Sequence, residues 1–134
     1  MTTPTQRTLA LARELGFQAQ VVERWNMHAR VRVDLFGIID IVAVHDDCGI
    51  VGIQACAGSS HAARRTKAME TDGLKRWLSA GGRFEVWSWA KQGPRGKRKV
   101  WTVRREELVL EGGGIVTALQ DPSELRLVRR KEKA

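Results

Sequence analysis

The sequence predicts an α/β domain with a central mixed β-sheet flanked by helices, and three observations support this prediction. Apolar, β-branched runs typical of buried strands alternate with segments whose apolar residues have helical spacing. The expected order is a helix, three strands, two helices and a strand pair, which suits a mixed sheet with helices on its faces. A chain of 134 residues has the size of one domain with one hydrophobic core.

The N-terminal part is expected to contain one helix and two strands. Residues 5–15 begin with a capping-competent threonine, have apolar residues at helical spacing and end before Gly16, which predicts a helix. Alternating apolar residues then predict a strand over residues 17–25. The next strand is expected over residues 32–44, with a bulge or bend at Gly37.

The remaining elements follow from the same signals. A third strand is expected over residues 50–56. Helices are expected over residues 61–69 and 73–80, each preceded by capping residues, and the second is ended by two glycines. Strands are expected over residues 83–90 and 100–104, joined by a loop rich in glycine and basic residues.

The domain organisation follows from a glycine run near the C-terminus. Gly112–Gly114 is interpreted as a break between a single α/β domain, residues 1–110, and a C-terminal extension, residues 111–134, whose basic tail is expected to be partly disordered. The chain contains no apolar run of membrane-spanning length, and its N-terminus lacks the regions of a signal peptide, so a soluble intracellular protein is expected.

Charge and cysteine content narrow the function classes. The formal net charge is +8 and the isoelectric point is about 10.3, which makes a polyanion, and by default a nucleic acid, the expected partner. Cys48 and Cys56 are too few for a disulfide framework, and no pairing of cysteine or histidine residues suggests a zinc site. Both thiols are expected to be reduced.

Two polar residues within apolar runs are the strongest candidates for chemistry. Asp40 interrupts the run 37–44, where a carboxylate without a cation or donor would be costly, and Gln54 interrupts the run 50–56. Adjacent strands would bring both side chains to one edge of the sheet. Because hard cations take oxygen ligands, Asp40 is interpreted as a metal ligand. The alternatives are that Asp40 caps or pairs with an arginine and that Gln54 is simply hydrogen-bonded within the sheet.

Asp40, followed by Ile53-Gln54-Ala55-Cys56, resembles the PD-(D/E)XK nuclease superfamily, nearest to its small Holliday junction resolvase-like and phage-type nucleases. In this superfamily an aspartate on one strand and an acid-x-lysine triplet on the next hold a divalent metal at the scissile phosphate. Gln54 stands in the place of the acid and Cys56 in that of the lysine. The resemblance covers roughly residues 5–104 and implies a restriction-endonuclease-like core.

The resemblance also implies a function. It implies a Mg²⁺-dependent DNA endonuclease, with Mn²⁺ as a substitute, in which Asp40, Gln54 and the carbonyl of Ala55 bind the metal. It further implies a structure-specific enzyme of DNA recombination that acts as a homodimer on branched DNA in the cytoplasm of a bacterial or phage-infected cell. The alternative is a degenerate nuclease fold that binds branched or single-stranded nucleic acid without cleaving it, which Gln54 and Cys56 favour. An RNA-binding accessory protein is a third interpretation.

Further residues are candidates to complete the site. Asp34 would share a face with Asp40 on an unbroken strand, although a bulge at Gly37 would reverse this, and pairing with Arg30 or Arg32 is the alternative. Glu14 and Glu23 are the alternative candidates for a further acidic residue of the site. The helix over residues 61–69 carries Arg64 and Lys67 on one face and His61 and Arg65 on another. Lys67 is the candidate for the missing lysine, Arg64 and Arg65 for nucleic-acid binding, and solvated basic residues are the alternative.

The segment from Lys91 to Arg105 is the strongest signal for nucleic-acid binding. It contains no acidic residue and seven basic ones, which are Lys91, Arg95, Lys97, Arg98, Lys99, Arg104 and Arg105. Neutralising phosphates there would give a salt-dependent affinity. Trp87, Trp89 and Trp101 on the flanking strands are interpreted as core or dimer-interface residues, with base stacking as the alternative.

Overall fold

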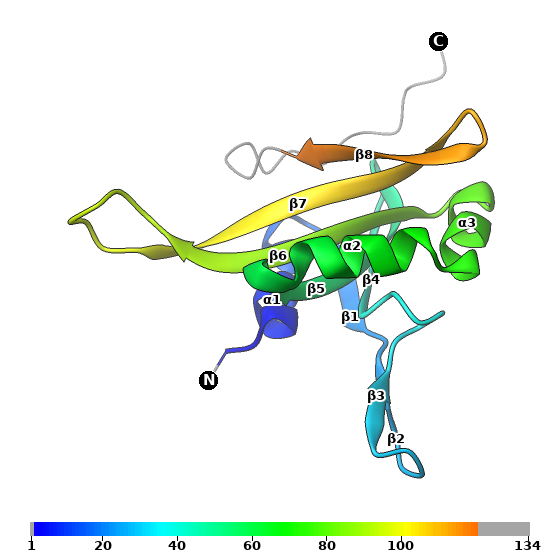
Figure 1. Ribbon diagram of the computed structural model, residues 1–134, viewed down its shortest axis with the longest axis horizontal. Helices are drawn as coiled ribbons and strands as arrows, with labels where there is room; N and C mark the ends of the chain where they lie inside the picture. The colour runs from blue at the N-terminus through cyan, green and yellow to red at the C-terminus, as the bar shows by residue number, and fades with distance from the viewer. Residues whose placement is uncertain (1, 121–134) are drawn as a thin grey trace.

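A six-stranded mixed sheet forms the centre of the molecule in this computed structural model, which describes residues 2–120 (Figure 1). The strand order is β1-β4-β5-β6-β7-β8, and all neighbours are antiparallel except β5 and β6, which are parallel. The strands are β1 (Gln18–Val21), β4 (Ile41–His45), β5 (Gly49–Ala57), β6 (Arg83–Gln92), β7 (Val100–Glu111) and β8 (Gly114–Gln120). The predicted α/β class with a mixed sheet is therefore confirmed.

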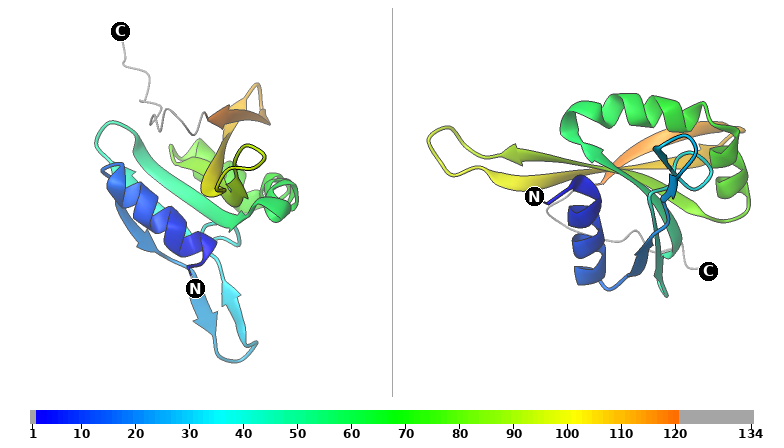
Figure 2. Two further views of the ribbon diagram at one scale, coloured as in Figure 1. Left: turned by 90° about the vertical axis from the view of Figure 1, so that its left-hand side faces the viewer. Right: turned by 90° about the horizontal axis from the view of Figure 1, so that it is seen from below.

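Helices cover both faces of the sheet (Figure 2). Helix α1 (Pro4–Glu14) packs with Ile53 of β5 on one face, whereas Cys56 of β5 lies in a second apolar cluster with residues of α2 (His61–Met69) and α3 (Asp72–Ser79). The short 3-10 helix η1 (Gly58–Ser60) precedes α2. The parallel pair β5 and β6 requires a crossover connection, and α2 and α3 supply it.

The three predicted helices are present with small shifts at their ends. Helix α1 begins one residue earlier than expected because Thr3, and not Thr5, is its cap. The Thr3 hydroxyl accepts a hydrogen bond from the Gln6 backbone N–H at 3.2 Å, and the Gln6 side chain accepts one from the Thr3 N–H at 2.9 Å. This reciprocal capping box satisfies two N–H groups at the helix start.

Two predicted strands are wrong, because each is divided between two sheets. Residues 17–25 include β1 and most of β2 (Arg24–Asn26). Residues 32–44 include part of β3 (Val31–Val33) and most of β4. Among the described residues, strands β2 and β3 pair only with each other, and they project from the main sheet as the β2–β3 hairpin, residues 24–33 (Figures 1 and 2). The chain bends at Gly37 as expected, but through a turn and not a bulge, with φ angles of 54° at Phe36 and 78° at Gly37.

The C-terminal part of the sheet is longer than predicted. The expected boundary at residue 110 falls inside β7, and β8 pairs with β7 along its length. Gly112 and Gly113 make the turn between them with φ angles of 60° and 82°, which glycine adopts at little cost. The expected tail, residues 121–134, lies outside the described residues. Within residues 2–120, no helix is long and apolar enough to cross a membrane.

Buried ion pairs explain why β7 extends through a charged sequence. The Arg105 guanidinium lies 2.9 Å from the Glu85 carboxylate, and Glu107 accepts hydrogen bonds from Arg83 at 2.9 Å. These partners come from the neighbouring strand β6, so the charges are paired within the sheet. Arg105 is thereby buried and is not part of the exposed basic surface that the sequence predicted.

Candidate functional site

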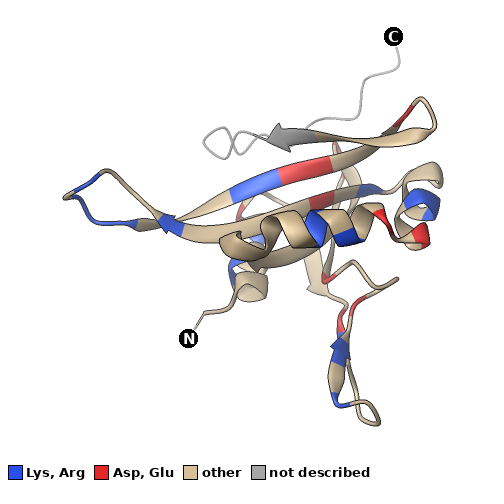
Figure 3. Cartoon of the chain, viewed as in Figure 1, with Lys and Arg blue, Asp and Glu red and all other residues tan. Residues whose placement is uncertain are grey.

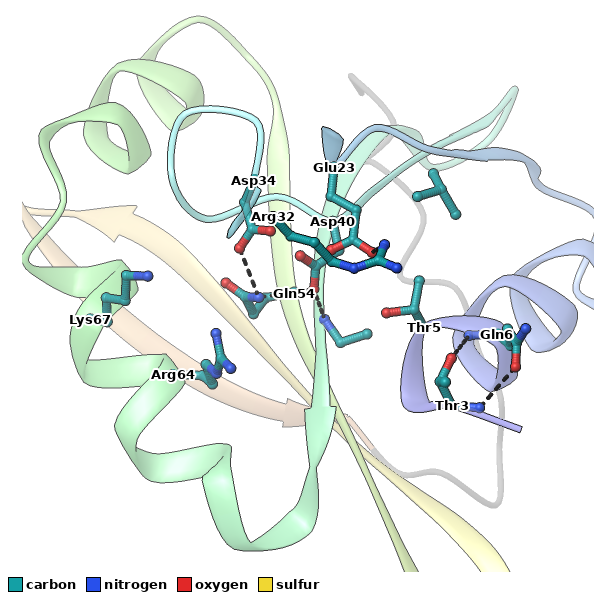
Figure 4. A pocket seen from close by; sticks show the side chains of 12 residues that line it. Thr3, Thr5, Gln6, Glu23, Arg32, Asp34, Asp40, Gln54, Arg64 and Lys67 are labelled. Carbon is teal, nitrogen blue, oxygen red and sulfur yellow. Dashed lines mark hydrogen bonds and ion pairs between the residues drawn. The ribbon is translucent and has the colours of Figure 1, made fainter. Parts of the chain in front are cut away.

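A cavity of about 620 Å³ lies where the N-terminus of α1, the base of the β2–β3 hairpin, the β4–β5 pair and α2 meet (Figure 4). It combines acidic, basic and neutral polar side chains. The residues that line it are Thr3, Thr5, Gln6, Val21, Glu23, Arg32, Asp34, Asp40, Gln54, Ala55, Arg64 and Lys67.

Three carboxylates meet in this cavity and are called the acid cluster: Glu23, Asp34 and Asp40. One carboxylate oxygen of each lies within 4.8 Å of the others. Glu23 directly precedes β2 and Asp34 directly follows β3, so the two stems of the β2–β3 hairpin bring them beside Asp40 at the start of β4. The three carboxylates therefore come together because the β2–β3 hairpin interrupts the two strands that the sequence predicted.

Asp40 is buried, with 4% of its surface exposed, and is the most strongly perturbed acid of the cluster. Its Oδ2 atom accepts hydrogen bonds from the Ala55 backbone N–H at 2.8 Å and from Gln54 Nε2 at 2.9 Å. Burial, together with a hydrogen bond to Asp34, raises the pKa of Asp40 to about 8, although the Ala55 N–H acts in the opposite direction. Without a cation the cluster therefore retains a proton at neutral pH.

Gln54 lies on β5 and is only 2% exposed. Its Nε2 points toward Asp40 and Asp34, at 2.9 and 3.4 Å, whereas its Oε1 has no hydrogen-bond partner among the described residues (Figure 4). A buried acceptor without a partner costs about 1–3 kcal/mol. A half-turn of the amide exchanges the two atoms and turns Oε1 toward the carboxylates, so this side chain can serve either as a donor or as an oxygen ligand.

The structure brings together most of the predicted site residues. Asp40, Gln54, Ala55, Asp34, Arg64 and Lys67 all line the cavity. Arg65 does not, because it pairs with Glu106 at 3.2 Å. Glu14 is exposed and does not line the cavity. The alternative that Asp34 pairs with Arg30 or Arg32 is not observed among the described residues, and Arg32 pairs with Glu23 instead, at 3.2 Å.

Cys56 occupies the position at which the resemblance expects a lysine. The thiol is buried in the apolar cluster under α2 and α3, and burial raises its pKa to about 11. It is therefore a neutral, unreactive group at physiological pH. Cations reach the cavity from α2 instead, where Arg64 and Lys67 lie one helical turn apart.

A buried polar network holds α2 in place. His61 Nδ1 lies 2.6 Å from Ser88 Oγ, and His61 Nε2 lies 2.8 Å from Glu106 Oε1. Burial lowers the pKa of His61, so the neutral ring links the helix to β6 and β7. All three side chains are buried and none of them lines the cavity, so the network positions the helix. The sequence carried no signal for Ser88 or Glu106.

Two residues that line the cavity are more important to the candidate site than the sequence indicated. Glu23 had been one of two alternatives for a further acid, and only the hairpin places it in the acid cluster. Gln6 lines the cavity from the first turn of α1, and it was not selected from the sequence. The capping box with Thr3 fixes the Gln6 side chain there.

A second feature is the basic hairpin, residues 91–100, between β6 and β7. It extends away from the sheet, and Lys and Arg residues follow its length (Figure 3). Five of the residues predicted to bind nucleic acid lie in this hairpin and all are exposed: Lys91, Arg95, Lys97, Arg98 and Lys99. Trp87 is buried as expected, whereas Trp101 is 44% exposed and carries the Arg7 guanidinium 3.9 Å from its ring centroid.

Comparisons with protein-family models, with curated proteins and with solved structures found no match to this chain. The cavity, the acid cluster and the basic hairpin are therefore the features of this protein from which a function can be inferred.

Proposed function

We propose that this protein is a metal-dependent DNA endonuclease of the PD-(D/E)XK type, with a restriction-endonuclease-like fold, that hydrolyses phosphodiester bonds in branched DNA as a homodimer in the cytoplasm. The observation that carries the proposal is the convergence of three carboxylates, a buried amide oxygen without a described partner and the two cations of α2 in one cavity. The order of helix, hairpin strands, crossover helices and further strands is consistent with that superfamily.

The acid cluster fits a hard divalent cation. Mg²⁺ and Mn²⁺ bind through carboxylate and amide oxygens, and Glu23, Asp34, Asp40 and the Oε1 atom of Gln54 provide such a set. The raised pKa of Asp40 agrees with this, because a carboxylate that is buried and lies next to Asp34 needs a positive charge or a proton. When bound, the cation supplies a water of lowered pKa and neutralises charge on the phosphate.

The remaining cavity residues act on the substrate. Lys67 and Arg64 present positive charge from α2 to the phosphate that enters the cavity. On the opposite side, Thr5 and Gln6 offer hydroxyl and amide groups from the first turn of α1. The basic hairpin binds the flanking DNA backbone by neutralising phosphates, without reading the sequence.

The alternative is a protein that binds branched or single-stranded nucleic acid and does not cleave it. The buried Cys56 favours this alternative, because the superfamily lysine has no counterpart on β5. The role of Lys67 distinguishes the nuclease from the binding protein. If the protein is a nuclease, Lys67 is the cation that can act from α2 in place of the superfamily lysine.

The proposal is tested by incubating the purified protein with a labelled four-way junction and with linear duplex DNA, in Mg²⁺, in Mn²⁺ and in EDTA. We expect nicks in the junction that depend on the metal and are absent in EDTA. Tight binding without cleavage in either metal would contradict the nuclease and support the binding protein.

Lys67→Ala should separate chemistry from binding. Because Lys67 faces the cavity, its loss should reduce the nicking rate by about 100-fold, whereas affinity for the junction in EDTA should change little. Lys75→Ala is the matched control, because Lys75 is an exposed lysine on α3. Equal nicking by both variants would exclude Lys67 as a cation that acts on the scissile phosphate.

Removal of charge from the basic hairpin should weaken DNA binding in a salt-dependent way. In Lys97→Ala/Arg98→Ala/Lys99→Ala, the slope of log affinity against log salt should become shallower by about one unit for each lost phosphate contact. Fluorescence anisotropy between 50 and 200 mM salt measures the slope, and Lys75→Ala/Arg76→Ala on α3 is the control. An unchanged slope would show that the hairpin does not contact DNA.

A further inference from the structure

The β2–β3 hairpin is, after the basic hairpin, a second arm that projects from the sheet. The proposed function assigns no role to its exposed side chains. It stands clear of the main sheet, and nearly all of its side chains are exposed (Figures 1 and 2). Between Glu23 and Asp34 its charged or titratable residues are three arginines and one histidine, with no acid. A surface of this charge suits a polyanion and disfavours a basic partner.

The hairpin has a defined shape at its tip and a fixed position at its base. Asn26 Oδ1 accepts hydrogen bonds from the backbone N–H groups of His28 at 3.0 Å and Ala29 at 3.1 Å, and the Arg30 N–H donates to the Asn26 carbonyl at 2.8 Å. At the base, Arg32 pairs with Glu23 of the acid cluster at 3.2 Å. A ligand held by the arm is therefore held at a set distance from the cavity.

The strand register places Trp25 on the cavity side of this arm. Trp25 is directly opposite Arg32, and opposed residues in antiparallel strands project from the same face. Glu23 lies two residues before Trp25 and Asp34 two residues after Arg32, so the alternation of strand residues gives all four the same face. Three of them, Glu23, Arg32 and Asp34, line the cavity.

Trp25 is 54% exposed although it is the largest side chain of the arm. An indole ring exposed among arginines offers a flat surface on which a nucleobase can stack, and such stacking is favourable for every base because each base has a π-face. Val31 lies on the opposite face of the same arm and is 51% exposed, so the arm contains its own control position.

We propose that Trp25 stacks on an unstacked nucleobase next to the phosphate in the cavity, so that the substrate class is DNA with an unpaired or extrahelical base beside the cleaved bond. This inference rests on the proposed function. It assigns the choice of substrate to the β2–β3 hairpin, whereas the basic hairpin binds any DNA backbone.

The test compares two duplexes that differ by a single unpaired adenine, in EDTA so that nothing is cleaved. Fluorescence anisotropy is measured for wild type, Trp25→Ala, Trp25→Phe and Val31→Ala. Wild type should prefer the bulged duplex. Trp25→Ala should bind that duplex about 5- to 100-fold more weakly, with little change for the paired duplex. Trp25→Phe should retain most of the preference, and Val31→Ala should behave as wild type.

The outcomes separate this inference from the proposed function. An equal preference for the bulged duplex in wild type and Trp25→Ala overturns the stacking role, even if the enzyme nicks DNA. An equal loss in Val31→Ala also overturns it, because the effect would then come from the hairpin as a whole. Preference that depends on Trp25, without nicking in Mg²⁺ or Mn²⁺, would support the stacking role and contradict the nuclease alone.

Discussion

Asp40→Asn is expected to reduce metal-dependent nicking by more than about 100-fold and, at the same time, to raise the unfolding temperature of the metal-free protein. Asparagine removes the ligand charge but retains the shape of the side chain. Its Oδ1 can accept the hydrogen bonds from the Ala55 N–H and from Gln54 Nε2, and its amide can donate to Asp34 in place of the shared proton. The variant therefore removes a buried carboxyl group that destabilises the fold, and with it a carboxylate that the metal needs as a ligand.

The pH dependence follows from the direction of the pKa shift. The pKa of Asp40 is raised from 3.8 to about 8 in the folded protein, so between these values the folded state holds a proton that the unfolded state has lost. Stability from this group is complete below pH 3.8, decreases as pH rises and is lost by about pH 8. The asparagine side chain does not titrate, so the difference between variant and wild type should widen over this range.

Thermal unfolding in EDTA between pH 5 and 8.5 measures the difference. Near pH 8 we expect Asp40→Asn to unfold about 5 °C or more above wild type, which corresponds to roughly 1 kcal/mol in a domain of this size. Mg²⁺ should raise the unfolding temperature of wild type and not of the variant. Asp46→Asn, in the exposed turn between β4 and β5, should change neither property. Full nicking by Asp40→Asn would remove Asp40 from the site.

Gln54→Glu is expected to increase the affinity for Mg²⁺ by roughly 10-fold or more, because affinity for hard cations rises with the number of carboxylate ligands. The substitution places the acid that the resemblance expects at the position where the amide oxygen now has no described partner. Without metal the same change adds a fourth carboxyl group, at a buried position, to the acid cluster, so the unfolding temperature in EDTA should fall.

Calorimetric titration with Mg²⁺ and thermal unfolding with and without metal test both effects. Gln18→Glu is the matched control, because Gln18 is exposed on β1 and does not line the cavity. It adds the same charge without adding a ligand. If Gln54→Glu and Gln18→Glu had the same affinity for Mg²⁺, Gln54 would not belong to the metal site, and its buried oxygen would need another explanation.

Local patterns sufficed for much of the fold. Capping and helical spacing placed the three helices within one or two residues, and apolar runs placed β5 and the start of β6. The same patterns failed where a continuous run of strand-forming residues is divided between two sheets, because alternation continues from β1 into β2 while the pairing partner changes. They also missed most of β7, since the charges of Arg105 and Glu107 are neutralised by β6 and not by neighbours in the sequence.

The candidate site shows the same division. Asp40 and Gln54 could be selected from the sequence because a polar residue within an apolar run needs a partner wherever the strand lies. Cys56, Arg64 and Lys67 could be assigned positions along the chain, but which face of α2 reaches the cavity depends on the contact of His61 with Ser88 and Glu106. That contact joins residues 27 and 45 positions apart, which no local pattern encodes.

The sequence by itself determined the α/β class, the positive charge that suits a nucleic acid, and the two polar residues at the centre of the site. Only the tertiary structure decided that Glu23 and Asp34 join Asp40 and that Trp25 lies on the cavity side of an arm. The physical reason is that charge and hydropathy are properties of each residue, whereas a site depends on the distances between residues that are far apart in the sequence. Those distances arise when the β2–β3 hairpin folds out and its two stems meet at the edge of the sheet.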